Sequence, residues 1–225
     1  MDNDVLRQAP LFSALDDEAM AALHASMAET KLRRGDVLFH EGDTGDKLYV
    51  VLEGKVKLGR TSSDGRENLL AIMGPGQMFG ELSLFDPGPR SATVTAVTDA
   101  TFASLSHEDL LRWLEGRPVV ARGLLAQLAG RLRKANDVVA DLVFSDVPGR
   151  VAKALLDLAD RFGRTADDGV HVHHDLTQEE LAQLVGASRE TVNKALADFA
   201  SRGWLRLEPR SVVIMDVERM ARRAR

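Results

Sequence analysis

Residues 79–93 read FGELSLFDPGPRSAT and place a carboxylate, a guanidinium and a glycine within one short stretch. Arg90 can hold a phosphate with two parallel hydrogen bonds. Gly80 and the hydroxyl of Ser91 allow further donors to close around the same anion. An ionised Glu81 only accepts hydrogen bonds, so it suits a sugar hydroxyl beside the phosphate. The stretch therefore predicts a site for a nucleotide with an accessible 2′-hydroxyl; the alternative is a surface turn with an incidental Arg–Glu pair.

The chain around this stretch has the pattern of a small antiparallel β-structure. Nine of its 18 glycines fall between Gly35 and Gly80. Short apolar runs separated by such turn signals favour an antiparallel sandwich or roll. The expected strands are 37–39, 48–52, 56–58, 69–73, 93–97 and 100–105, with a short helix over 16–27 ahead of them.

Composition narrows the protein class. A chain of 225 residues, 44% of them hydrophobic, suits one large or two small domains with real cores. We expect no membrane span and no signal peptide, because no apolar run is long enough and the first residues are acidic. The absence of cysteine fits a reducing, cytoplasmic location and excludes disulfides and thiolate metal sites. Residues 146–225 hold 13 basic and 13 acidic side chains, so any DNA contact must come from locally placed bases.

The pattern changes to helix at about Pro118. Apolar residues then step by three and four positions, as in the seam of a two-stranded coiled coil. This predicts a long helix that joins two copies of the chain into a symmetric dimer, with a core helix lying on the roll as the alternative. The seam residues are Leu125, Leu128, Leu132, Ala135, Val139 and Leu142.

A second unit begins at Ser145–Arg150, where Ser or Asp can cap a helix and Pro148 lies in its first turn. Gly163 ends that helix. A polar loop is expected over 164–169 and a short strand over 170–172. Thr177 and Glu180 match a capping box for a helix over 178–185 that buries Leu181, Ala182 and Leu184.

The next helix, 189–201, starts at a Ser188 cap after a tight turn and buries Val192, Leu196 and Phe199. Its first turns carry polar side chains, and two apolar runs, 204–207 and 211–215, follow it as a wing. A helix-turn-helix with polar side chains at the front of its second helix, followed by a wing, is typical of DNA-binding proteins. A solvated helical hairpin is the alternative. The residues expected at DNA are Arg189, Glu190, Asn193 and Lys194 toward bases, and Thr177, Ser188 and Thr191 toward phosphates.

Taken together, these motifs resemble the catabolite activator (cyclic-AMP receptor) branch of the bacterial cyclic-nucleotide-fold transcription regulators, and most closely its actinobacterial members. The resemblance covers essentially the whole chain. It is carried by the motifs at 34–36, 41–46, 54–56, 80–83 with 90–91, 146–150 and 186–192.

The resemblance implies an α+β chain in three parts: an antiparallel β-roll that binds a cyclic nucleotide (1–117), a dimerisation helix and hinge (118–145) and a winged helix-turn-helix (146–225). It implies a cytoplasmic, homodimeric transcription regulator, not an enzyme, that binds inverted-repeat sites on double-stranded DNA and contacts RNA polymerase but no membrane. Cyclic AMP is the leading effector, and no metal is expected. The ligand residues carried over are Gly80, Glu81, Leu82, Ser83, Arg90, Ser91, Ala135 and Asn136.

One position departs from the family pattern. Cyclic-AMP-dependent members have Thr where this chain has Ala135, and that hydroxyl meets the adenine; Asn136 keeps a polar contact. A lost hydrogen bond weakens binding by about 0.5–1.5 kcal/mol. Another cyclic nucleotide, or DNA binding without a ligand, is therefore the alternative function.

Two functions from other classes are disfavoured by the histidines. A cupin-like metalloenzyme needs His and carboxylates clustered in the roll, where only His40 and His107 lie. A haem-based sensor needs an axial His or Cys near the dimer helix, and 108–170 contains neither. His171, His173 and His174 have metal-like spacing, but exposed strand or loop histidines are the favoured interpretation.

Overall fold

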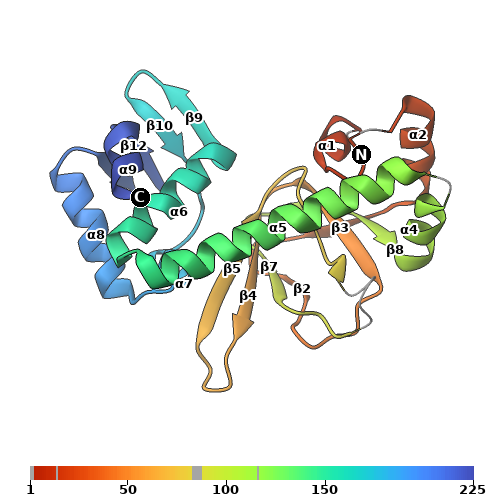
Figure 1. The fold of residues 1–225 in the computed structure, drawn as a ribbon, viewed down its shortest axis with the longest axis horizontal. Coiled ribbons are helices and arrows are strands. Elements are labelled where there is room, and N and C mark those ends of the chain that lie inside the picture. Colours follow the sequence, from red (N-terminus) through yellow and green to blue (C-terminus); the bar gives the residue numbers. More distant parts are fainter. Residues whose placement is uncertain (1–2, 14, 83–87, 116) are drawn as a thin grey trace. The chain divides into compact units, whose positions relative to one another are not determined.

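The computed structural model describes residues 3–13, 15–82, 88–115 and 117–225 (Figure 1). It separates into two compact units. The first comprises residues 1–65 and 70–134, and the second comprises residues 66–69 and 135–225.

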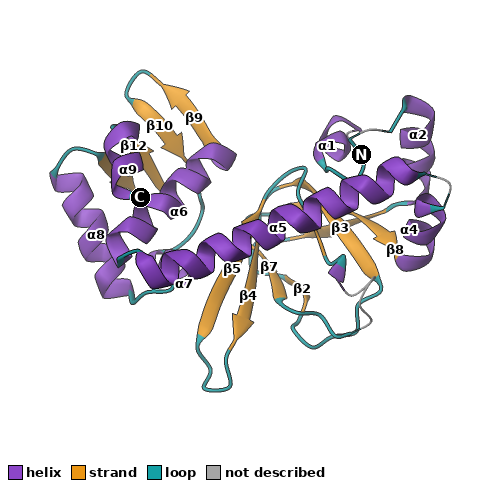
Figure 2. Ribbon diagram, viewed as in Figure 1, coloured by secondary structure: helices purple, strands orange, loops and turns teal. Residues whose placement is uncertain are grey.

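The first unit is built on an antiparallel roll of two four-stranded sheets, drawn in orange in Figure 2. One sheet has the order β1-β8-β3-β6 and the other β2-β7-β4-β5. The strands are β1 (Ala28–Leu32), β2 (Val37–Phe39), β3 (Lys47–Glu53), β4 (Val56–Thr61), β5 (Glu67–Met73), β6 (Met78–Phe79), β7 (Thr93–Ala96) and β8 (Ala100–Ser106).

The central strand β3 is apolar between its charged ends, from Leu48 to Leu52, because both of its faces are covered. Leu48, Val50 and Leu52 point to one hydrophobic cluster, while Tyr49 and Val51 point to another inside the roll. Successive side chains of a strand alternate between faces, so one strand supplies both cores. Strand β8 does the same, with Leu105 on the first side and Phe102 on the second.

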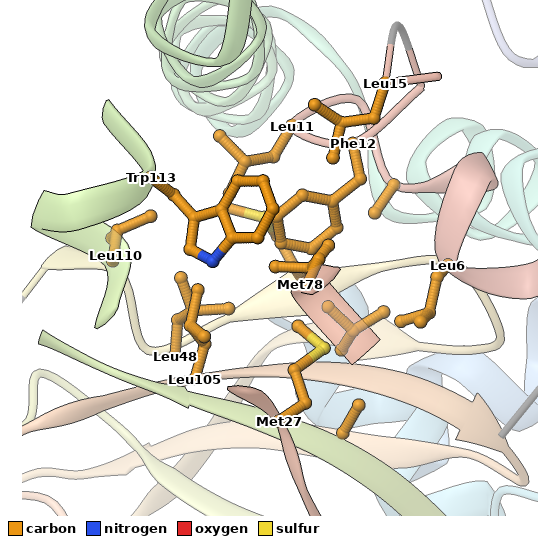
Figure 3. Packing of buried hydrophobic residues seen from close by; sticks show 14 of the residues in the cluster. Leu6, Leu11, Phe12, Leu15, Met27, Leu48, Met78, Leu105, Leu110 and Trp113 are labelled. Carbon is orange, nitrogen blue, oxygen red and sulfur yellow. The ribbon is translucent and has the colours of Figure 1, made fainter. Parts of the chain in front are cut away.

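Among the described residues, the roll is accompanied by α1 (Asn3–Gln8), α2 (Asp17–Ser26), α4 (His107–Leu114) and the first part of α5 (Pro118–Phe144). Their apolar side chains pack on the face of the first sheet that carries Leu48 and Leu105, around Phe12, Met78 and Trp113 (Figure 3). Val120 and Leu124, from the start of α5, complete this cluster. The first half of α5 is thereby fixed to the roll.

The second unit joins the end of α5 to a helical domain with a small sheet. Its helices are α6 (Val147–Phe162), α7 (Gln178–Val185), α8 (Arg189–Ser201) and α9 (Val217–Arg223). Its sheet has the order β11-β12-β10-β9, from β9 (Gly163–Ala166), β10 (Gly169–Val172), β11 (Leu205–Glu208) and β12 (Ser211–Ile214). Helix α6 packs against α7, α8 and α9, so it is the centre of this unit.

Most of the expected elements are confirmed, with two corrections. The polar loop expected over 164–169 is wrong, because Gly163–Ala166 forms β9 and pairs with β10. Helix α7 buries Val185 beside Leu181 and Ala182, whereas Leu184 is only half-buried. Leu128 packs partly against the core of the first unit, and its place in a coiled-coil seam stays a prediction. Elements α1, α4, α9, β1 and β6 were not expected from the sequence.

Candidate functional site

Among the described residues of the first unit, the buried charged side chains are Glu81 and Arg90, and both belong to the 79–93 stretch. Glu81 is fully buried and Arg90 is 4% exposed. Arg90 donates from Nη1 to the Gly80 carbonyl and from Nη2 to the Lys47 carbonyl, each at 2.9 Å. The surface-turn alternative does not describe this arrangement, because neither charge is at the surface.

Aromatic side chains line the other side of Arg90. The guanidinium carbon lies 4.3 Å from the Phe39 ring centroid and 5.8 Å from that of Tyr49, within the range of cation–π attraction. Burial lowers the pKa of Arg90 and raises the pKa of the Tyr49 phenol. Both directions reflect the cost of placing charge in a poorly solvated site.

Gly80 allows the guanidinium to come this close. Its φ is +84°, and a Cβ there would lie 2.8 Å from Arg90 Nη1 and 3.0 Å from the Lys47 carbonyl oxygen. A side chain at this position would be strained and would also collide with the arginine. Glycine at position 80 is therefore required by the position of Arg90.

The two buried charges are not fully satisfied. Glu81 Oε2 and Arg90 Nε are both buried with no hydrogen-bond partner among the described residues. Such atoms are costly unless a further group pairs with them. The site therefore offers one unpaired donor and one unpaired acceptor, which matches a ligand carrying an anion and a hydroxyl.

Arg131 of α5 is a site residue that our sequence analysis did not assign. It pairs with Glu81 Oε1 and donates to the Met78 carbonyl. A buried carboxylate needs a counter-charge, so the buried Glu81 was the signal that could have led to it. Through this contact the first half of α5 reaches the site.

The remaining expected ligand residues are less enclosed. Leu82 and Ser91 are exposed, and Ser83 lies outside the described residues. Ala135 and Asn136 are exposed on α5, at the start of the second unit. Their contact with a ligand stays a prediction.

The expected helix-turn-helix is confirmed, with its caps. Thr177 Oγ1 accepts from the Glu180 amide at 3.1 Å, and Glu180 accepts from the Thr177 amide at 2.8 Å, which completes the capping box. Ser188 caps α8, and its hydroxyl also bonds that of Thr191 at 2.9 Å. Ser188 and Thr191 are both exposed, beside and within the first turn of α8.

The front of α8 carries three exposed charges: Arg189, Glu190 and Lys194. Lys194 Nζ lies 2.7 Å from Glu190 Oε1, an i,i+4 pair on the surface. Such a pair is weak, so both side chains can exchange it for other partners. Asn193 corrects the expected pattern, because it is half-buried and its Oδ1 is buried without a partner among the described residues.

The histidines near the wing have other partners. His171 Nε2 lies 2.6 Å from Asp168 Oδ1, and the buried His174 accepts from the Leu176 amide at 3.1 Å. Across the described ranges, no group of three or more His, Cys, Asp or Glu side chains is arranged to hold a metal ion. Among the residues that the structure describes, no helix is long and apolar enough to span a bilayer.

Comparisons with known proteins agree with both halves of this description. Residues 29–117 match the cyclic nucleotide-binding domain, and residues 149–223 match the Crp-like helix-turn-helix domain. The chain is 55% identical over 223 residues to a CRP-like cAMP-activated global transcriptional regulator of Mycobacterium tuberculosis, covering 99% of this chain and 100% of that protein.

Two solved structures are also similar. The N-terminal domain of a transcriptional regulator from Streptomyces coelicolor A3(2) is 65% identical, with a TM-score of 0.51, over 64% of this chain and 99% of that one. A c-di-GMP-responsive global regulator from Xanthomonas campestris is 26% identical, with a TM-score of 0.75, over 88% of this chain and 99% of that one. With a cyclic nucleotide-binding domain followed by a Crp-like helix-turn-helix, the chain belongs to the Crp family of DNA-binding transcription regulators and is not an enzyme.

Proposed function

We propose that this protein is a homodimeric, cyclic-AMP-responsive regulator that binds inverted-repeat DNA sites. The observation that carries the ligand assignment is the pair of unsatisfied buried atoms, Arg90 Nε and Glu81 Oε2. A cyclic nucleotide supplies a phosphate for the first and a ribose 2′-hydroxyl for the second. Neither inorganic phosphate nor a plain sugar satisfies both.

Arg90 holds the cyclic phosphate in this proposal, aided by Ser91, Ser83 and the backbone at Gly80 and Leu82. Glu81 accepts from the 2′-hydroxyl and keeps Arg131 as its counter-charge on the other oxygen. The family resemblance assigns Ala135 and Asn136 to contacts with the base. Cyclic AMP is favoured because the relative from Mycobacterium tuberculosis, alike over its whole length, is named for activation by cAMP.

Another cyclic nucleotide is the second candidate. Ala135 has no hydroxyl to bond an adenine, and the similar regulator from Xanthomonas campestris is described as c-di-GMP-responsive. An unchanged phosphate and ribose site with a different base contact would accept such a ligand. The remaining alternative is that the protein binds DNA without any ligand.

The dimer follows from α5. Leu125 and Leu132 are each 65% exposed, and Val139 and Leu142 are also exposed, along one stripe of the helix. Repeats of this kind are covered by a second helix in a coiled coil, and a second copy of the chain supplies the same stripe. Two copies then present two α8 helices, with Arg189, Glu190 and Lys194 toward bases and Thr177, Ser188 and Thr191 toward phosphates. Asn193 lies at the edge of this set.

We further propose that residues 1–117 bind the nucleotide, 118–145 dimerise and 146–225 read DNA. The protein acts in the cytoplasm, with RNA polymerase as its partner at promoters. Arg131, Ala135 and Asn136 are exceptions to this division, because they lie in the dimerisation segment but are assigned to the nucleotide site.

Calorimetric titration with cyclic AMP, cyclic GMP and c-di-GMP tests the effector, since only the correct nucleotide gives saturable binding. Arg90→Leu removes the phosphate donor and should abolish that binding, with circular dichroism to confirm the fold. Arg60→Leu is the matched control, because Arg60 is an exposed arginine of the same unit that pairs with Glu41 at 2.7 Å. Unchanged affinity in Arg90→Leu would refute the site, and binding of none of the three nucleotides would refute the proposed effector class.

A further inference from the structure

Only Ser145 and Asp146 separate helix α5, which ends at Phe144, from helix α6, which begins at Val147. Any change of angle between the end of α5 and the DNA-reading helices must pass through these two residues. We call Ser145–Asp146 the link. The bonds that Arg150 and Arg223 make to the link all join residues of the second unit.

Arg150 connects the first link residue, Ser145, to the helix-turn-helix formed by α7 and α8. Its Nη1 donates to the Ser145 carbonyl at 2.8 Å, and its Nε donates to the Val185 carbonyl at 3.0 Å. Val185 ends α7, at the turn before α8. One guanidinium therefore joins the link to the helix-turn-helix.

Arg223 holds the second link residue from the opposite end of the sequence. Its Nη2 lies 2.6 Å from Asp146 Oδ2, while Asp146 Oδ1 accepts from the Gly149 amide at 2.9 Å and caps α6. The bond to Arg223 is the largest cause that lowers the pKa of Asp146. Both oxygens of this one carboxylate are thus engaged.

The approach of α9 to the link is close. A Cβ on the buried Gly149 would lie 3.3 Å from both Arg223 Nη1 and the Arg223 carbonyl oxygen. The helix is fixed in this position by Met220, which is fully buried. The last residues of the chain are therefore packed against the first turn of α6, beside the link.

We propose that Arg223 is a positioning residue: through Asp146 it holds the link in the conformation that orients the reading helix for DNA. The ion pair is partly exposed, with side-chain exposures of 32% for Arg223 and 62% for Asp146, so it adds little to the free energy of unfolding. The ion pair instead restricts the angles between α5 and α6 that the link can adopt. Without it the link samples more angles, and the dimer must order both links when it binds two half-sites.

The test measures the Kd of the full-length protein for a duplex that the wild type selects from random DNA. Arg223→Gln should weaken binding by about fivefold to tenfold, equivalent to about 1–1.4 kcal/mol, with a nearly unchanged melting temperature. Arg222→Gln is the matched control, because Arg222 is the neighbouring arginine of α9 and pairs with Glu218 at 3.3 Å, away from the link. It should change the Kd by less than twofold, and Arg223→Lys should restore most of the affinity.

Two further measurements separate positioning from other roles. Asp146→Asn keeps an effective helix cap but removes the charge, so it should weaken binding like Arg223→Gln, and the double variant should be no weaker than either single one. The dependence of log Kd on log salt should stay the same in Arg223→Gln, whereas a lost phosphate contact would reduce its slope by about one.

The proposal is overturned by an unchanged Kd in Arg223→Gln, by an equal loss in Arg222→Gln, by additive effects in the double variant or by a reduced salt slope. It rests on the proposed function only for its DNA target. Repeating each measurement at zero and saturating cyclic AMP separates the two, because a wild-type Kd that ignores cyclic AMP refutes the effector and leaves the comparison of variants intact.

Discussion

At the scale of single residues, the proposed ligand site depends on Glu81, a buried carboxylate with only one of its two oxygens paired among the described residues. Glu81 is fully buried, pairs with Arg131 through Oε1 and keeps Oε2 free of partners among the described residues. Burying a charge is tolerated when a counter-charge accompanies it. Arg131 therefore contributes to the stability of the first unit as well as to the shape of its site.

Removing Arg131 should expose this dependence. Arg131→Met leaves Glu81 buried without a counter-charge, and we expect it to lower the free energy of unfolding by about 2–3 kcal/mol, below the range for a fully buried pair because Arg131 is 32% exposed. Glu81→Gln should cost less, since the neutral amide needs no counter-charge. Urea unfolding measures both. In the double variant, Glu81→Gln should recover part of the loss from Arg131→Met; a purely additive loss would mean that the two side chains act separately.

At the scale of elements, the first half of α5 is positioned by the N-terminal segment. A Cβ on Gly123 would lie 2.5 Å from the Pro10 carbonyl oxygen and 3.1 Å from the Leu11 Cα, whereas one on Gly130 would meet nothing within 4 Å. The atoms that would clash with a side chain at Gly123 belong to the backbone, so they cannot move away by a change of side-chain rotamer. This glycine lets the segment lie directly on the helix.

Alanine at these two glycines should have opposite effects. Gly123→Ala should lower the free energy of unfolding by about 1–3 kcal/mol, as for other overpacked sites. Gly130→Ala should raise it by about 0.5–1 kcal/mol, because alanine favours the helix and the site is open. Thermal unfolding of both variants checks the pair. Equal shifts of the same sign would contradict the close contact with the N-terminal segment.

The turn between β9 and β10 should be sensitive to acid. His171 first, and then Arg206 at 2.8 Å, lower the pKa of Asp168 from 3.8 to about 2. Because the folded pKa is lowered, Asp168 stabilises the fold above pH 3.8, and this contribution is lost as the pH falls toward 2. Carbon-13 NMR should find the Asp168 carboxyl titrating near pH 2 and should find a larger rise of its pKa in His171→Gln than in Arg206→Gln. A wild-type value near 3.8 would contradict the two hydrogen bonds.

Local sequence signals predicted the elements whose ends are marked by capping residues. Caps at Thr177 and Ser188 predicted α7 and α8, because the capping residues satisfy backbone groups of their own helix. Strand β9 was not predictable in this way: its sequence, GRTA, contains no apolar run, and it forms a strand because β10 offers backbone partners. Arg131 was missed for the same reason, since its role depends on Glu81, which lies 50 residues away in the sequence.

At the scale of the whole molecule, the proposed dimer rests on the exposed stripe of α5 formed by Leu125, Leu132, Val139 and Leu142. Replacing Leu125 and Leu132 with Asp places carboxylates in a two-fold interface, where an unpaired charge is costly. Sedimentation velocity should then show monomers, with little loss of fold because each side chain is 65% exposed in the single chain. Leu111→Asp, an exposed leucine of α4, should stay dimeric. Leu128 is unsuitable for this test, because it packs on the first unit. A dimeric double variant would refute the seam.

DNA recognition is the property that needs the whole dimer. Two copies related by a two-fold axis should select an inverted repeat whose half-sites lie about 34 Å apart, the spacing known for the family. The exposed Arg189 should read a guanine, Glu190 a cytosine and Lys194 a second guanine, since these side chains match those base edges. Losing the Arg189 contact should remove about 1–3 kcal/mol of discrimination at one base pair of each half-site.

Selection from random DNA with Arg189→Ala measures this loss directly, because the preference at that base pair should relax while the rest of the motif stays. Thr191→Val is the matched comparison from the same helix turn. Its hydroxyl is placed toward a phosphate and bonds Ser188 at 2.9 Å, so the variant should bind every sequence more weakly and select the wild-type motif. If Arg189→Ala recovers the wild-type motif unchanged, Arg189 does not read a base, and the specificity of the dimer must come from other side chains of α8 or from the shape of the DNA.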